Sequence, residues 1–90
     1  MEPVEVTVEF YGIPRQRAGR AELAVMARNV GDVLASVERA CPGLAGLLQS
    51  DGRLTPHYLL SLSGQRFMQN GSELVRRGDR FMLLSADAGG

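Results

Sequence analysis

The sequence contains no lysine, and its ten basic residues are all arginine. Without an ε-amine, the chain cannot form a Schiff base through a side chain or accept an isopeptide bond on one. Ten acidic residues balance the arginines, so the formal net charge is zero. A neutral chain is not drawn in bulk to nucleic acid or to anionic lipid, and we expect neither as a partner.

Cysteine and long apolar runs are also scarce. Cys41 is the single cysteine, so no internal disulfide can form, and we expect a cytoplasmic protein rather than one of an oxidising compartment. No apolar run reaches the roughly 18 to 20 residues that span a bilayer. The first residues, Met1 to Val4, lack the basic and apolar segments of a signal peptide. We therefore expect no membrane partner.

The motifs that hold metals and phosphates are missing as well. His57 has no second histidine, cysteine or carboxylate cluster at metal-ligand spacing, so no metal site is predicted. No glycine-rich loop precedes a helix in the way that a phosphate site requires. We therefore expect no bound cofactor.

The sequence does contain a clear order of strands around one helix. Apolar and polar residues alternate over residues 4–11 and 21–28, which predicts two strands, and the polar stretch 15–19 is expected to be a hairpin loop. Further strands are predicted over residues 58–63, 66–68 and 80–84. One helix is predicted between the second and third strands. Its apolar face consists of Val30, Val33, Leu34, Val37 and Cys41, with Asn29 as N-cap and Pro42-Gly43 as the stop. Leu74 and Val75 are expected to anchor an irregular segment in the core.

These elements predict an α+β domain of the β-grasp type over residues 1–84. Ninety residues suffice for one domain with one core. We expect a mixed sheet of four to five strands with the helix on one face, and the last strand parallel to the first because most of the chain lies between them. Such a fold serves many functions, so it does not decide this one.

The chain ends in a thin segment, Ser85 to Gly90, which we predict to be a flexible tail behind the last strand. Gly89 and Gly90 have no Cβ, so such a tail fits a narrow channel that larger residues would block. The terminal carboxylate is then a group that a partner enzyme can activate. The plain alternative is a frayed terminus without a function.

The sequence resembles the MoaD/ThiS family of ubiquitin-like sulfur carriers over essentially its whole length. The resemblance is carried by Asn70-Gly71, by Gly78-Asp79 before an apolar strand, by the terminal Gly89-Gly90, and by Val8 to Gly12 near the start. The family often has Pro-Pro and an apolar residue in the tail, where this chain has Ser85-Ala86-Asp87. The resemblance implies that the chain is a co-substrate rather than an enzyme.

It further implies that a ubiquitin-activating-like adenylyltransferase, with its own ATP and magnesium, adenylates the carboxylate of Gly90. Sulfur then converts that carboxylate to a thiocarboxylate. The expected acceptor is a sulfur-accepting enzyme such as the large subunit of molybdopterin synthase, in molybdenum cofactor biosynthesis. Sulfur transfer for cysteine, thiazole or tRNA thiolation is an alternative, as are a ubiquitin-like protein modifier and a β-grasp binding module whose tail has no role.

Other side chains are weighed for partner binding. Tyr11 and Leu84 are predicted to face away from the helix, and comparable positions in the family form an apolar docking patch. Phe67 is a further candidate, with local packing as its alternative. Asp87 and Ala88 are expected to contact the partner through the tail. Three arginines near the tail in sequence could meet an acidic partner or simply be solvated, namely Arg76, Arg77 and Arg80. Cys41 is expected to be a buried structural residue rather than a reactive thiol.

Overall fold

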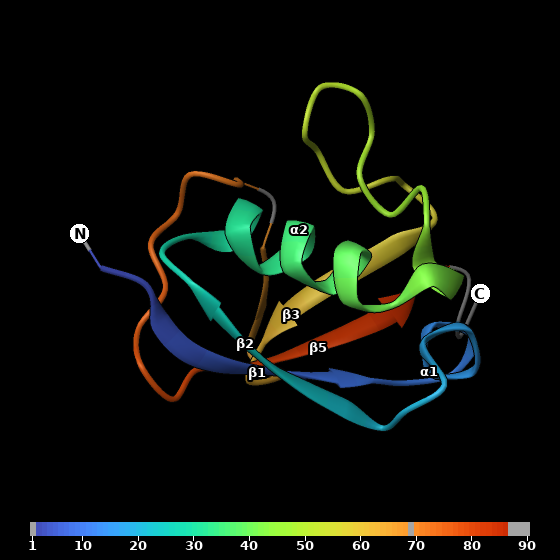
Figure 1. Cartoon of the computed structure of the whole chain (residues 1–90), viewed down its shortest axis with the longest axis horizontal. Coiled ribbons are helices and arrows are strands. Elements are labelled where there is room, and N and C mark those ends of the chain that lie inside the picture. The colour runs from blue at the N-terminus through green and yellow to red at the C-terminus, as the bar shows by residue number, and fades with distance from the viewer. Residues whose placement is uncertain (1, 69, 87–90) are drawn as a thin grey trace.

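The computed structural model describes residues 2–68 and 70–86. A five-stranded sheet is covered on one face by a single long helix (Figure 1). The elements in chain order are β1 (Val4–Phe10), α1 (Ile13–Ala18), β2 (Glu22–Ala27), α2 (Val30–Ala40), the 3-10 turn η1 (Pro42–Leu44), β3 (Tyr58–Leu62), β4 (Arg66–Phe67) and β5 (Arg80–Ser85). No helix of this described part is long and apolar enough to cross a membrane.

The sheet has the strand order β2-β1-β5-β3-β4. β1 pairs with β2 as an antiparallel hairpin, and β5 lies beside β1 in parallel. β3 pairs antiparallel with β5 on its other side, and β4 forms a short edge. The predicted β-grasp arrangement is confirmed, including the parallel contact between the first and last strands.

The core lies between α2 and the face of the sheet that it covers. Alternation sends Val6, Val8 and Phe10 of β1 to that face, and all three are buried. Phe81 and Leu83 of β5 are fully buried beside them. α2 begins as predicted, because the side chain of Asn29 accepts a hydrogen bond of 2.8 Å from the amide of Asp32.

The predicted loop over residues 15–19 is wrong, because Ile13–Ala18 form the helix α1. Pro14 occupies the first turn, where its missing N–H is not needed, and its side chain is buried. Gly19 ends the helix in the left-handed conformation (φ 74°). A helix of six residues, of which three are polar, has too few apolar positions for a helical period to be visible in the sequence.

The expectation for Leu74 is also wrong. Its side chain is 58% exposed, whereas the neighbouring Val75 is 6% exposed and belongs to the core. Backbone pairing explains the difference, since Leu74 forms an isolated antiparallel bridge with Asn29. Neighbouring residues in an extended segment point to opposite sides, so one of the two faces solvent.

Candidate functional site

The end of β5 defines the candidate site. β5 continues through Ser85, which is buried and pairs with Tyr58, so the strand runs one residue beyond the predicted domain boundary. The amide of Ala86 donates a hydrogen bond of 2.8 Å to the carbonyl of His57. The four predicted tail residues Asp87, Ala88, Gly89 and Gly90 lie outside the described residues. The chain is therefore attached to the sheet as far as Ala86, the last residue that the structure describes.

An apolar surface lies on the sheet face that α2 leaves open. We call it the open face and define it by Tyr11, Leu59, Phe67, Met82 and Leu84. Leu59 lies opposite Leu84 in the β3–β5 register, and Ser61 lies opposite both Met82 and Phe67. Tyr11 follows β1, and its amide donates to the carbonyl of Leu83 (3.2 Å).

The structure brings the three predicted docking residues to this one face. Tyr11 is 41% exposed, Phe67 is 56% exposed, and Leu84 is half-buried. Leu59 and Met82 were not predicted from the sequence, because their contribution depends on which strands become neighbours. The register between strands is a property of the tertiary structure. Of the residues on β5 and β3, only Leu84 was predicted to face away from the helix.

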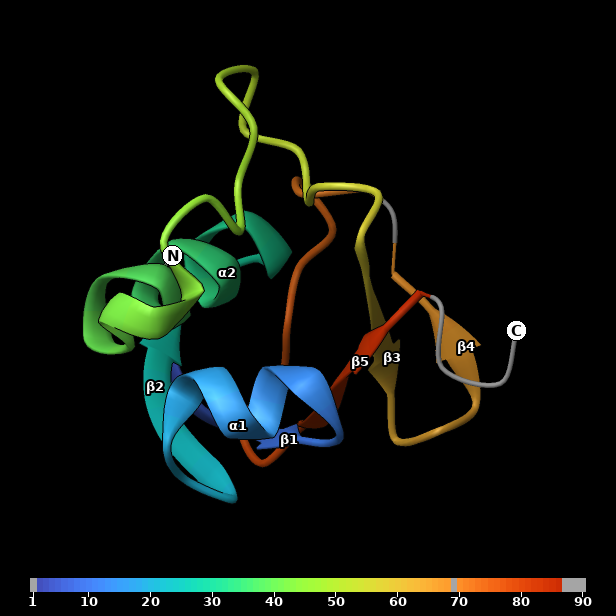
Figure 2. The ribbon, with the colours of Figure 1, turned by 90° about the vertical axis from the view of Figure 1, so that its right-hand side faces the viewer.

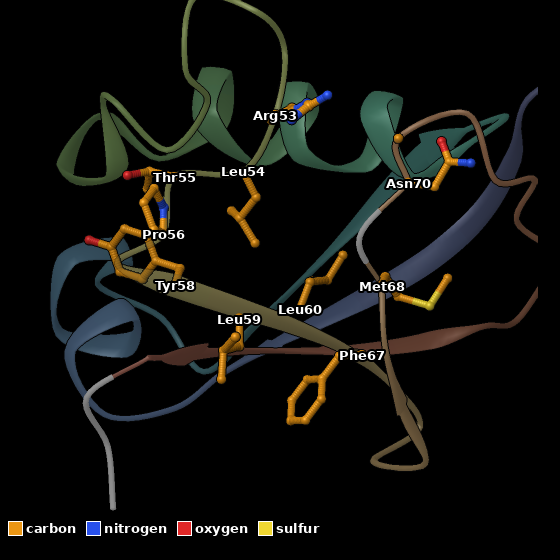
Figure 3. A pocket seen from close by; sticks show the side chains of 11 residues that line it. Arg53, Leu54, Thr55, Pro56, Tyr58, Leu59, Leu60, Phe67, Met68 and Asn70 are labelled. Carbon is orange, nitrogen blue, oxygen red and sulfur yellow. The ribbon is translucent and has the colours of Figure 1, made fainter. Parts of the chain in front are cut away.

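A hollow of about 680 Å³ adjoins the open face. Figure 3 shows it between the loop that carries Leu54, strand β3, and the segment that carries Phe67 and Met68. Leu59 and Phe67 project to one side of β3 in this view, while Leu54 and Leu60 project to the other. Because Leu59 and Phe67 line the hollow, the open face and the hollow form a continuous apolar surface. Such a surface on a small domain is typical of a partner site.

Hydrogen bonds hold Tyr11 in place. Its hydroxyl donates to Glu9 Oε1 at 2.6 Å, and Arg80 donates to Glu9 Oε2 from Nε (2.9 Å) and Nη2 (2.6 Å). The bond from Tyr11, and secondarily that from Arg80, lowers the pKa of Glu9 below its ordinary value. The same bond to the Glu9 carboxylate raises the pKa of Tyr11. Arg80 is thus ion-paired at the open face and is not a free cation.

The other two arginines that are near the tail in sequence lie at the opposite end of β5 from it. Arg76 and Arg77 precede the first residue of β5, whereas the tail follows its last residue, so the length of the strand separates them. The arginine nearest the end of β5 comes from α1. Arg17 Nη1 donates to the hydroxyl of Tyr58 at 2.8 Å, and Tyr58 pairs with Ser85. Sequence reasoning missed Arg17 because it placed this segment in a loop.

The remaining candidates have structural roles. Cys41 is buried in the core, and burial raises the pKa of its thiol, which fits the predicted structural residue. His57 is exposed, and its carbonyl oxygen accepts the bond from Ala86. Within residues 2–68 and 70–86, no three histidine, cysteine or carboxylate side chains are grouped so that they could hold a metal ion.

Comparisons with known proteins place the fold. No protein-family model matches the sequence, and no curated protein matches it. Solved structures do match. The small archaeal modifier protein 1 (SAMP1) from Methanosarcina acetivorans has a TM-score of 0.80 and 24% identity, with 100% of each chain covered.

Two further structures share the fold. The putative molybdopterin converting factor subunit 1 from Pyrococcus furiosus has a TM-score of 0.72 and 20% identity, covering 91% of this chain and 97% of that one. The Amycolatopsis orientalis BexX/CysO complex contains a chain with a TM-score of 0.76 and 22% identity, covering 94% of this chain and 99% of that one. The resemblance to MoaD/ThiS-type ubiquitin-like proteins is thereby confirmed for the fold.

Proposed function

We propose that the chain is a ubiquitin-like sulfur carrier whose reactive group is the carboxylate of Gly90. One observation carries the proposal: β5 is paired until Ser85 and leads directly into the last four residues, beside an exposed apolar face. Four residues span at most about 14 Å. A partner that docks on the open face therefore has Gly90 within reach of a nearby active site.

The proposed reaction at Gly90 has two steps. A terminal carboxylate has a pKa of about 3.5 and is ionised at neutral pH. The ionised oxygen attacks the α-phosphate of ATP, which releases pyrophosphate and leaves an acyl-adenylate. A sulfur nucleophile then displaces AMP, and Gly90 becomes a thiocarboxylate. The partner adenylyltransferase supplies the ATP site, the magnesium ion and the cationic groups that stabilise the phosphoryl charge.

We propose molybdopterin synthesis as the destination of the sulfur, with this chain as the small subunit of a heteromeric synthase. The molybdopterin converting factor subunit from Pyrococcus furiosus, which has the same fold, supports this assignment. The BexX/CysO complex supports a sulfur-accepting enzyme of another kind and keeps alternative acceptors open, including those for cysteine, thiazole or tRNA thiolation.

The test begins with the intact protein. Incubated with ATP, magnesium, a sulfur donor and the adenylyltransferase of the same organism, it should gain the mass difference between sulfur and oxygen in its last peptide. Deletion of Gly90 should abolish the change while the thermal transition stays nearly the same, because terminal residues contribute little to stability. A gain of mass elsewhere in the chain, or activation of the truncated protein, would contradict the proposal.

A protein modifier is the second candidate, and the name of the archaeal neighbour SAMP1 favours it. Because the chain has no lysine, polymeric chains through lysine isopeptides cannot form. Denaturing pull-down of tagged protein and trypsin digestion, followed by a search for the remnant of residues 81–90 on lysines of other proteins, separates the two, because Arg80 is the last site at which trypsin cuts this chain. Abundant remnants that depend on Gly90 would place the modifier first.

A further inference from the structure

Three arginines belong to α1 or follow it directly, and this helix packs beside the end of β5. Arg15 and Arg17 belong to α1, and Arg20 follows it; α1 lies beside the end of β5 (Figures 1 and 2). Arg53, Arg66 and Arg80 each pair with an aspartate or glutamate. Among the described residues, by contrast, no carboxylate forms an ion pair with any of the three arginines at this end. Within residues 2–68 and 70–86 they therefore have no acidic partner, a property they share with Arg28, Arg39, Arg76 and Arg77.

Arg17 lines a defined hollow. A cavity of about 370 Å³ lies next to the exit of the tail and is lined by Ile13, Arg17, Ala45, Gly46, Thr55, His57, Tyr58 and Ser85. The bond of 2.8 Å to the Tyr58 hydroxyl fixes one guanidinium nitrogen of Arg17 and leaves its other N–H groups for a ligand. Thr55 and His57 add further polar groups to the lining, and no acidic residue lines the cavity.

The other two arginines line a second hollow. Arg15 and Arg20 face a shallow space of about 530 Å³ that Gly12, Gln16, Gly19 and Ala21 complete, again without an acidic residue. α1, which carries Arg15, begins at Ile13, two residues after Tyr11. The cationic surface therefore adjoins the open face, and a partner that covers Tyr11 meets these arginines too.

We propose that Arg15, Arg17 and Arg20 bind carboxylate side chains of the adenylating partner, which flank the channel that the tail enters. A guanidinium binds a carboxylate through two parallel hydrogen bonds, and Arg17 is held in a position that allows it. The arginines are not assigned to the nucleotide, because the reacting carboxylate belongs to Gly90, four residues beyond Ala86 in sequence, and four fully extended residues span about 14 Å. This inference rests on the proposed function and specifies the partner surface.

The experiment measures pyrophosphate exchange into ATP by the adenylyltransferase of the same organism, at varied concentrations of this protein. The double variant Arg15→Gln/Arg17→Gln should raise KM about tenfold, equivalent to about 1.4 kcal/mol, and leave kcat nearly unchanged. Added salt should raise the KM of the wild type more than that of the double variant. Arg77→Gln removes the same charge at the other end of β5 and should match the wild type.

Two variants separate charge from packing. Tyr58→Phe removes the hydrogen bond to Arg17 but keeps the cation, so its KM should rise much less than that of Arg17→Gln. Arg17→Lys should recover part of the loss. An unchanged KM and salt response in the double variant, or an equal effect of Arg77→Gln, would overturn the inference while leaving the carrier function intact. If the wild type supports no exchange, the proposed function fails, and this inference fails with it.

Discussion

Gly43→Ala should destabilise the domain by driving α1 away from η1. An ideal Cβ on Gly43 would lie 2.0 Å from the carbonyl oxygen of Arg17 and 2.9 Å from its carbonyl carbon. Both atoms belong to the backbone, so no side-chain rotation can relieve the overlap, and α1 must shift by about an ångström or more. Overpacking of this kind costs about 1 to 3 kcal/mol. For a domain of this size, each kcal/mol lowers the melting temperature by roughly 4 to 8 °C.

Thermal unfolding followed by circular dichroism measures the effect, and we expect a loss of roughly 8 to 16 °C, corresponding to about 2 kcal/mol. Gly71→Ala is the matched control, because its new Cβ would meet Gly31 at an ordinary distance of 3.7 Å and its backbone is not left-handed. The control should stay within about 0.5 kcal/mol of the wild type. Equal melting temperatures for the two variants would show that α1 does not pack on Gly43 as described. Because Arg17 moves with α1, Gly43→Ala should also raise the KM for the adenylating partner.

Three further predictions test the two faces of the sheet. An aspartate should weaken partner binding, measured by calorimetry, at each of the positions Tyr11, Phe67 and Leu84, since an unpaired charge would be buried at an apolar contact. The same change at the exposed Met26 of β2 should leave the affinity unchanged. Wild-type affinity in all three variants would place the docking surface elsewhere. Leu83→Ala should lower the free energy of unfolding by about 2 to 5 kcal/mol because Leu83 is fully buried, whereas Leu84→Ala should lower it clearly less. Similar losses for the two variants in urea unfolding would contradict the assigned faces. In a Tyr58→Phe background, Glu9→Gln should bring the raised pKa of Tyr11 back toward its ordinary value near 10 in an ultraviolet titration. The raised pKa implies a stabilising contribution that is complete below pH of about 10 and is lost as pH rises through the folded-state value, so an unchanged titration would refute the bond.

The fold could be predicted from the sequence where a pattern repeats along one element. Alternation over β1 and β2 assigned their buried faces correctly, and helical spacing with Asn29 as N-cap located α2. α1 could not be found, because six residues give less than two turns and Pro14 also fits a loop. Leu74 was misplaced for a related reason, since a single bridge to Asn29 sets its direction and no period does.

The candidate site was predictable only in part, because contacts between distant segments do not appear as a pattern along one element. The parity of β5 placed Leu84 on the open face, but neither Leu59 nor Met82 could be joined to it without the strand order. Likewise, only arginines that are near the tail in sequence were weighed, namely Arg76, Arg77 and Arg80. Proximity in a sheet follows from pairing between distant segments, and it brought α1 and Arg17 there instead.

The central position of β5 explains how one small domain can both present a reactive end and keep its stability. β5 is hydrogen-bonded on both sides near its last residues, since the amide of Tyr11 donates to Leu83 and the amide of Ala86 donates to His57. A central strand held in this way frays less readily than an edge strand. Alternation then assigns Phe81 and Leu83 to the core, and Met82 and Leu84 to the open face. Changes in partner preference on the open face are therefore possible with little loss of core packing, while the core keeps the exit of the tail at a constant place beside that face.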